Sequence, residues 1–257
     1  MEILKNLYNY RELLKTNITK DIGGKYKKSF LGVLWSFLNP LLQIVVYAFV
    51  FQVVLKSNIP NYTVYLCCGL IPWQFFSAVV TRGAATMIDN GNILKKVYFP
   101  REVLPISLVT SEMVNFVIST IIILCFVIFG KIGLSINLLW YFIILFVQYL
   151  VSIGIALIVS SITVYFRDLL HILGIIIQLL FYATPIVYSV EQVPAKFLWV
   201  MKLNPMSYLI TCYRDIFYYK TAPSIHNLLI ATIMGGILIA IGIVTFKKLE
   251  KRFAEEL

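Results

Sequence analysis

Long runs without charged residues alternate with short basic segments along the chain. The first run extends from Ser29 to Leu55, and the longest extends from Ile132 to Phe166. A helix of about 20 apolar residues crosses the roughly 30 Å hydrocarbon core of a bilayer. The pattern therefore predicts an all-α membrane protein with a single transmembrane domain over residues 1–257. Six transmembrane helices are expected, at residues 29–55, 62–88, 104–129, 138–163, 169–188 and 228–246.

Four other segments are too short or too polar to cross. In residues 1–28, apolar side chains recur at spacings of three and four, which predicts an amphipathic helix on the inner leaflet. Residues 189–226 hold two apolar, aromatic pieces with the length of re-entrant or interfacial helices. Residues 90–103 connect the second and third expected spans, and residues 247–257 form a basic tail.

The placement of positive charge gives the expected orientation. Most of the 22 Lys and Arg residues lie in the leading segment, in the 90–103 connection and in the tail. Short loops on the cytoplasmic side of membrane proteins carry an excess of Lys and Arg. Both termini are therefore expected in the cytoplasm, which requires an even number of crossings.

Composition supports this class and excludes others. Only 13% of the residues are charged and 60% are hydrophobic, whereas soluble domains carry about 25% charged residues. The basic residues flank apolar runs, so nucleic acid is not expected as a partner. The four cysteines lack the spacing of metal ligands, and no phosphate-binding loop or catalytic motif is present. We therefore expect no enzyme activity and no cofactor or metal in this chain, and the energy for any transport must come from an ion gradient or from a partner.

Two ionisable residues are expected at similar depth inside the bilayer. Arg82 lies near the end of the second expected span and Glu112 near the start of the third. A lone charge there costs about 2.5–3.5 kcal/mol on insertion scales, so these residues are predicted to form an ion pair. A secondary transporter would use such groups as a proton relay, and a membrane-embedded transferase would need a His or carboxylate cluster.

The first expected span contains an Asn-Pro step. Pro40 removes one backbone hydrogen bond of the helix, and Asn39 could satisfy the group that is freed. The step predicts a kink in this helix. The kink could allow two walls of a channel to move apart, or it could be a static feature without motion. Three tryptophans are expected to anchor the helices at the membrane interfaces: Trp73, Trp140 and Trp199.

Several motifs resemble one known family along the whole chain. They are "KYKKSFLGVLWSFLNPL", "GLIPWQFF", "NILKKVYFPREVLPI", "VYFRD" and "LNPMSYLITCYRDIF", in this order. The family comprises the permease subunits of bacterial ABC exporters for lipid-linked polysaccharides, such as O-antigen, capsule and teichoic acid. The run "KKVYFPREVLP" is the most specific of these motifs. An exporter permease for drugs or small lipids is the alternative.

The resemblance implies a homodimer in the bacterial cytoplasmic membrane, bound to two copies of a cytoplasmic ATPase subunit that uses ATP and Mg. The cargo would be an undecaprenyl-linked glycan that passes between the two protomers. The segment expected to couple to the ATPase comprises Asn92, Ile93, Leu94, Lys95, Lys96, Val97 and Tyr98. Residues of the expected external gate are Trp199, Pro205, Tyr208 and Arg214.

Aromatic residues suit such a cargo. The chain contains 16 Tyr and 18 Phe residues; aromatic rings stack on the C–H faces of sugars, and Tyr hydroxyls bond to their oxygens. Aromatic belts at the membrane interfaces are the alternative use. The residues expected to line the channel are Tyr47, Phe51, Phe181, Tyr182 and Tyr188.

Overall fold

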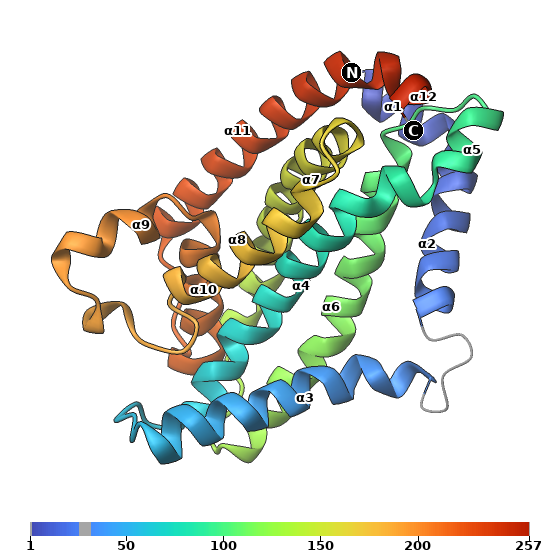
Figure 1. Ribbon diagram of the computed structural model, residues 1–257. Helices are drawn as coiled ribbons and strands as arrows, with labels where there is room; N and C mark the ends of the chain where they lie inside the picture. The colour runs from blue at the N-terminus through green and yellow to red at the C-terminus, as the bar shows by residue number, and fades with distance from the viewer. Residues whose placement is uncertain (1, 26–31, 257) are drawn as a thin grey trace.

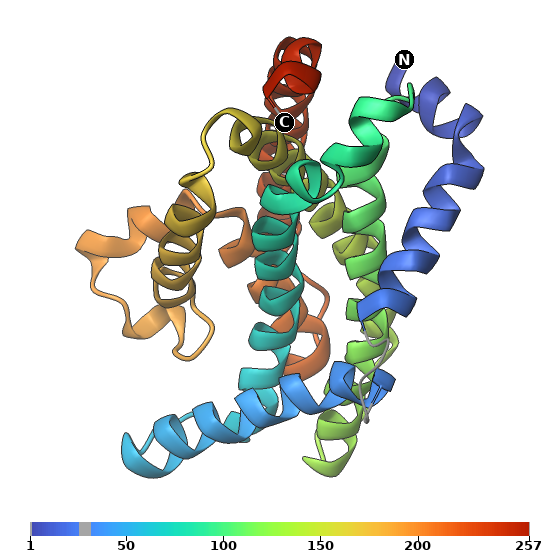
Figure 2. The same cartoon turned by 45° about the vertical axis from the view of Figure 1, so that its right-hand side comes forward.

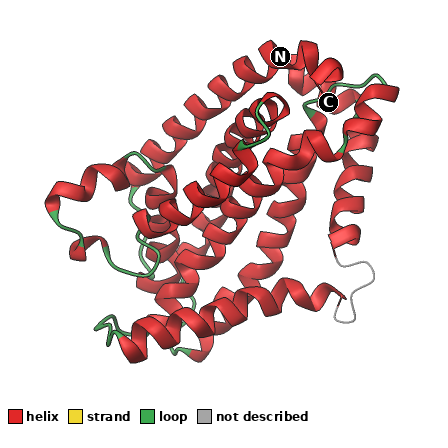
Figure 3. Cartoon of the chain, viewed as in Figure 1, coloured by secondary structure: helices red, strands yellow, loops and turns green. Residues whose placement is uncertain are grey.

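The computed structural model describes residues 2–25 and 32–256, and every regular element in them is helical (Figures 1 and 3). The α-helices are α1 (Glu2–Asn9), α2 (Arg11–Lys25), α3 (Trp35–Ala48), α4 (Tyr62–Asp89), α5 (Gly91–Lys96), α6 (Val103–Phe129), α7 (Tyr141–Tyr165), α8 (Leu169–Ala183), α9 (Leu198–Lys202), α10 (Pro205–Arg214), α11 (Ile225–Leu249) and α12 (Phe253–Glu256). Two π-helical turns, Phe49–Val54 and Asp215–Tyr219, extend α3 and α10. Short 3-10 turns are η1 (Gly32–Leu34), η3 (Ile136–Trp140), η4 (Val190–Gln192), η5 (Ala195–Phe197) and η7 (Glu250–Arg252).

The bundle is built around α4. The helices α6, α7, α8, α10 and α3 all contact α4, and α4 runs through the middle of both views (Figures 1 and 2). Its most apolar stretch is 78% buried, against 22% for that of α11 and 11% for that of α3. The central helix thus presents apolar side chains on nearly all faces, whereas α3 and α11 leave one face uncovered.

Glycines allow α7 and α11 to pack with their backbones almost in contact. A methyl group on Gly154 of α7 would lie 2.6 Å from the carbonyl carbon of Leu238. A methyl group on Gly242 of α11 would lie 2.7 Å from the carbonyl oxygen of Gly154. Small residues allow such close approach between membrane helices, where dispersion contacts replace the hydrophobic effect as the driving force.

The fifth expected span, 169–188, is an α-helix only in its first 15 residues. Helix α8 ends at Ala183, and Thr184 is extended because the ring of Pro185 disfavours helical geometry in the residue before it. The 15 residues of α8 cover only about 22 Å at 1.5 Å per residue. Within the described residues, five helices are long and apolar enough to cross a membrane by length and composition.

The segment after α8 is fixed by side chains from α4 and α10. The Tyr62 hydroxyl donates to the carbonyl oxygen of Val187 at 2.8 Å, and the Tyr65 hydroxyl donates to that of Tyr188 at 3.1 Å. Arg214 donates from Nη2 to the carbonyl oxygen of Ile186 at 2.7 Å. Buried carbonyls that helix α8 no longer satisfies therefore find donors elsewhere.

The leading segment differs from the single helix expected over residues 1–28. It forms α1 and α2 with a break at Tyr10, and α2 packs along α6 (Figure 2). Residues 26–31, which include the start of the first expected span, lie outside the described residues. From Trp35 onward the expected span is helical to Val54, and it runs across α4 and α6 toward the end of the bundle away from the termini (Figures 1 and 2).

Both termini and α5 lie at one end of the bundle (Figure 1). The side chain of Phe253 in α12 is fully buried and packs in one cluster with Leu94 of α5. Arg101 donates to the carbonyl oxygen of Glu250, and its guanidinium carbon lies 5.8 Å from the centre of the Phe253 ring. The tail therefore fixes α5 against the ends of the long helices.

At the opposite end, α10 inserts back into the bundle. Its residues Leu209, Ile210 and Tyr213 are fully buried. The Tyr213 hydroxyl donates to Oε1 of Gln148 at 2.8 Å, and Nε2 of Gln148 donates to the carbonyl oxygen of Pro72 at 2.8 Å. This chain of bonds joins α10, α7 and α4, and it satisfies the polar atoms that burial would otherwise leave unpaired.

The substitution Gly154→Ala is expected to destabilise the bundle, because its methyl group would meet backbone atoms of α11 that have no free space to move. Overpacking of this kind costs about 1–3 kcal/mol, so the thermal unfolding temperature of the purified protein in detergent should fall. Gly236→Ala on α11 is the matched control, since no atom lies within 4 Å of its added methyl group. Equal unfolding temperatures for the two variants would contradict the close packing of α7 and α11.

Candidate functional site

Three apolar helices carry polar residues with the same spacing. In each set the intervals are three and then four residues, which places the side chains on one face of a helix. Polar groups inside membrane helices are rare and face the protein interior or a water-filled cavity. The sets are Ser36, Asn39 and Gln43 of α3, Gln74, Ser77 and Thr81 of α4, and Glu112, Asn115 and Ser119 of α6.

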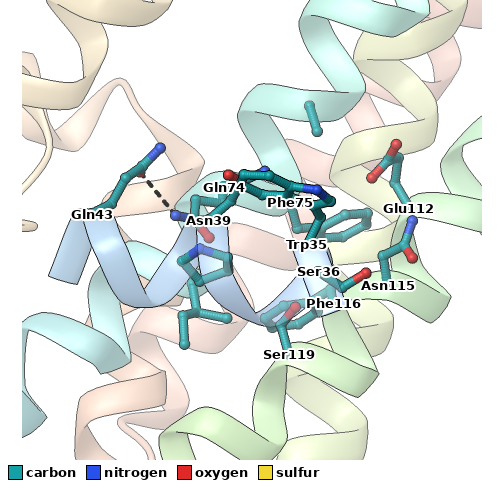
Figure 4. Close-up of a pocket in the computed structure, with 13 residues that line it drawn as sticks. Trp35, Ser36, Asn39, Gln43, Gln74, Phe75, Glu112, Asn115, Phe116 and Ser119 are labelled. Carbon is teal, nitrogen blue, oxygen red and sulfur yellow. Dashed lines mark hydrogen bonds between the residues drawn. The ribbon is translucent and has the colours of Figure 1, made fainter. Parts of the chain in front are cut away.

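These polar faces meet in a cavity of about 370 Å³ between α3, α4 and α6 (Figure 4). Phe75 and Phe116 form part of its wall; their rings are stacked with centroids 5.3 Å apart and planes 5° apart. Trp35 lies near these rings, and Asn39, Asn115 and Ser119 add polar groups. The cavity therefore combines flat apolar surfaces with hydrogen-bonding groups, of which only Glu112 is ionisable.

A second cavity of about 400 Å³ lies further along α3, between α3, α4 and α8. Its aromatic lining is formed by Tyr47, Trp73, Phe181 and Tyr182. The rings of Tyr47 and Phe181 are stacked with centroids 5.2 Å apart. The polar lining includes Gln178 of α8 and residues of the α4 set.

A hydrogen bond between two glutamines joins α3 to α4 at the boundary of the two cavities. Nε2 of Gln74 donates to Oε1 of Gln43 at 2.9 Å (Figure 4), and both residues line both cavities. Each amide keeps further donors and acceptors for another partner. We call the two cavities together the polar groove.

The structure brings Arg82 and Glu112 together in an ion pair beside the polar groove. The Glu112 side chain is 3% exposed and lines the first cavity, whereas the Arg82 side chain is 38% exposed. Pairing neutralises a carboxylate that would be costly to bury alone. The polar groove therefore offers amides, hydroxyls and aromatic faces with its one lining carboxylate neutralised. No group of His, Cys, Asp and Glu residues in the described ranges is arranged to hold a metal ion.

Of the residues expected to line a channel, Tyr47, Phe181 and Tyr182 line the polar groove. Phe51 instead packs between Tyr47 and Tyr62, with ring centroids 6.5 and 6.4 Å away. Tyr188 donates its hydroxyl to the carbonyl oxygen of Tyr182 at 2.7 Å and lines neither cavity. The tandem Asn39-Pro40 lies within α3, and both residues line the first cavity.

Sequence reasoning missed the amide residues of the polar groove, above all Gln43, Gln74 and Gln178. The shared spacing of polar residues in three apolar runs is the signal that could have found them. Trp73 was expected to be an interface anchor, but its side chain is 4% exposed and lines the second cavity. Trp199 is 61% exposed on α9, at the end of the bundle away from the termini (Figure 1).

The segment expected to couple to a partner is only partly helical. Helix α5 covers Gly91–Lys96, so Asn92, Ile93, Leu94, Lys95 and Lys96 lie on it, whereas Val97 is extended and Tyr98 follows it. Leu94 points into the bundle and is buried. The exposed side chains on this surface, called the α5 surface below, are Ile93, Lys95, Lys96, Val97 and Tyr98, of which Tyr98 is 95% exposed.

Arg214 was expected on an external gate, but its side chain is 3% exposed. Its guanidinium carbon lies 3.5 Å from the centre of the Tyr65 ring, an arrangement that stabilises a desolvated cation. Burial lowers the pKa of Arg214. Nearby, Pro205 starts α10 and the Tyr208 hydroxyl donates to the carbonyl oxygen of Lys202 at 3.2 Å. Arg214 thus fixes the segment after α8 instead of facing a passage.

Comparisons with known proteins agree on one family. The family described as "ABC-2 type transporter" matches residues 12–218. An O-antigen export system permease protein RfbA of Klebsiella pneumoniae is 37% identical over 251 residues, which cover 97% of this chain and 96% of the relative. The protein of the same name from Myxococcus xanthus is 34% identical over the full length of both chains. The polysialic acid transport protein KpsM of Escherichia coli is 21% identical over 76% of this chain and 77% of its own length.

These matches agree with the apolar helices, which indicate a multi-pass membrane protein. Both the family match and the relatives above 30% identity span most of the chain. The chain belongs to the ABC-2 type transporter family.

Proposed function

We propose that this chain is the transmembrane permease subunit of an ATP-driven exporter that moves a lipid-linked polysaccharide out of the bacterial cytoplasm. Relatives named for O-antigen export and for polysialic acid transport support the cargo class. The carrier expected for such glycans is undecaprenyl, and the cargo is of the O-antigen, capsule or teichoic acid type. The chain carries no catalytic role in this proposal.

The polar groove is the observation that carries this proposal. A polysaccharide has many hydroxyl groups along its edges and apolar C–H faces on its rings. Amides such as Gln43, Gln74 and Gln178 can donate to and accept from hydroxyls, and the rings of Tyr47 and Phe181 offer stacking surfaces. Weak, repeated contacts of this kind suit a cargo that must move along the groove.

A second copy of the chain would close the polar groove into a channel. Gln43, Thr81 and Gln178 are exposed in the single subunit. The groove is bordered by α3 and α8, whose outward faces expose apolar side chains such as Val46 and Leu179, 59% and 66% exposed. The proposed assembly is therefore a homodimer in which α3 and α8 of both protomers surround the path.

The fifth of the six crossings in this proposal combines α8 with the segment after it. Residues 184–188 form turns and bends, and they carry the chain beyond the roughly 22 Å that α8 covers. Bonds from Tyr62, Tyr65 and Arg214 to this segment satisfy its backbone. Six crossings place both termini on one side, and their basic residues assign that side to the cytoplasm.

A separate ATPase subunit is the proposed source of energy, with two copies per homodimer that bind ATP and Mg. The α5 surface exposes Ile93, Val97 and Tyr98 next to Lys95 and Lys96. Exposed aromatic and apolar side chains beside positive charge are typical of protein contact sites. Because the tail fixes α5 to the long helices, a displacement of α5 by the ATPase subunit would also move those helices. At the outer end, α9 and α10 would border the exit.

The substitution Gln74→Leu is expected to reduce glycan export, because it removes an amide from both cavities while keeping the side chain's size. Loss of one hydrogen bond of about 1 kcal/mol corresponds to about a fivefold effect. Surface glycan on cells with matched permease levels provides the measurement. Gln52→Leu is the control, since Gln52 lies beyond the polar groove and bonds only to Thr63 among the described residues. Normal export by Gln74→Leu cells would remove the polar groove from the path.

The substitution Tyr98→Ala is expected to weaken binding of the ATPase subunit about tenfold or more, as for an aromatic residue that anchors an interface. Co-purification and titration of the ATPase subunit against the permease in nanodiscs measure this change. The control is Phe129→Ala, which removes another exposed ring, 82% exposed, at the opposite end of α6. Equal affinities of both variants and the native chain would exclude the α5 surface as the docking site.

A further inference from the structure

A cavity of about 520 Å³ lies at the end of the bundle away from the termini, apart from the polar groove. The segment around α9 covers one side through Leu198 and Met201, and α10 forms the other side through Ser207, Tyr208 and Thr211. Figure 1 shows α9 and α10 at this end, beside the start of α11. We call this cavity the outer pocket. Its size is that of cavities that hold small ligands.

One buried polar atom at the outer pocket lacks a hydrogen-bond partner within the part of the chain that the structure describes. Ser207 is 7% exposed, and its hydroxyl oxygen has no hydrogen-bond partner among the described residues. A buried hydroxyl without a partner has lost its hydrogen bonds to water and destabilises the folded state. A ligand that donates to or accepts from this hydroxyl would offset that loss.

Neighbouring hydroxyls donate their protons to backbone carbonyls, so their oxygens remain available as acceptors. The Thr211 hydroxyl donates to the carbonyl oxygen of Ser207 at 2.9 Å. The Tyr208 hydroxyl donates to the carbonyl oxygen of Lys202 at 3.2 Å. Asn227 at the start of α11 also lines the outer pocket and contributes an amide, which has both donors and an acceptor. The polar side of the cavity therefore matches a ligand with several hydroxyl groups.

The remaining wall is apolar. Pro185, Leu198 and Met201 line it, and Pro185 and Met201 are buried. Glu191 and Lys202 contribute one charge of each sign at the edge, and the His226 imidazole adds a further hydrogen-bonding group. An anion would require an excess of cations, and a lipid chain would require an apolar lining throughout. A sugar ring presents an apolar face and a hydroxyl edge, and it carries no charge.

From this lining we infer that the outer pocket binds a neutral hexose unit of the glycan after it leaves the polar groove. The inference rests on the proposed function for the identity of the cargo. The fixed segment 184–188 separates the two sites, because Phe181 lines the polar groove and Pro185 lines the outer pocket. A sugar held beyond this segment would oppose return of the chain into the groove.

Saturation-transfer NMR on the permease in nanodiscs tests the inference with three neutral probes, the methyl glycosides of glucose, galactose and mannose. At least one probe is expected to receive saturation from the protein. Ser207→Ala should weaken its binding about fivefold, the loss expected for one hydrogen bond. Asn227→Ala, near the surface, is the second variant and tests the same site if Ser207→Ala impairs folding, which thermal unfolding would reveal.

Gln74→Leu serves as the comparison, because it alters the polar groove and leaves the outer pocket intact. Two results would overturn the inference. In one, Gln74→Leu abolishes the saturation of the probe while both outer-pocket variants retain it. In the other, no probe receives saturation. Glycan export by the native chain is measured in parallel. Normal export by a chain that saturates no probe would contradict only the inference about the outer pocket. A native chain that exports no glycan would contradict the proposed function.

Discussion

A polar side chain inside an apolar helix must find a partner or face water, and this constraint organises the whole bundle. Glu112 pairs with Arg82, and Gln148 is satisfied by Pro72 and Tyr213. Gln43 and Gln74 form a hydrogen bond with one another, and each amide keeps further donors and acceptors for another partner. Where the polar faces of α3, α4 and α6 meet, they enclose the polar groove instead of a closed core. The proposed path for a hydrophilic cargo thus consists of residues that are unfavourable in contact with lipid.

The same requirement ties the two ends of the molecule to the groove. At one end, the buried Phe253 and the bond from Arg101 fix α5 to the long helices. At the other, Arg214 and two tyrosines of α4 hold the segment after α8. Because α4 lines the groove and contacts both α5 and α10, movement at the α5 surface can reach the outer end through one helix.

Periodicity and charge could predict the helical class, most helix bounds and the meeting of Arg82 with Glu112, because each depends on local pattern or on depth in the bilayer. The end of α8 required the steric effect of Pro185 on Thr184, which the uniform hydrophobicity of residues 169–188 concealed. The burial of Arg214 and Trp73 depends on which helices surround them, and one sequence does not contain that information. The amides of the polar groove could have been predicted only in part. Their spacing is visible in the sequence, but polar residues on the exposed face of an ordinary helix have the same spacing.

The central claim is that the glycan passes along the polar groove, and photo-crosslinking tests it most directly. A photoreactive phenylalanine analogue at Gln178 would sit in the groove, whereas the same residue at Ile241 would sit on the exposed face of α11. During export, we expect a ladder of glycan-linked permease from position 178 and none from position 241. Glycan linked equally at both positions, or at neither while export continues, would contradict the account.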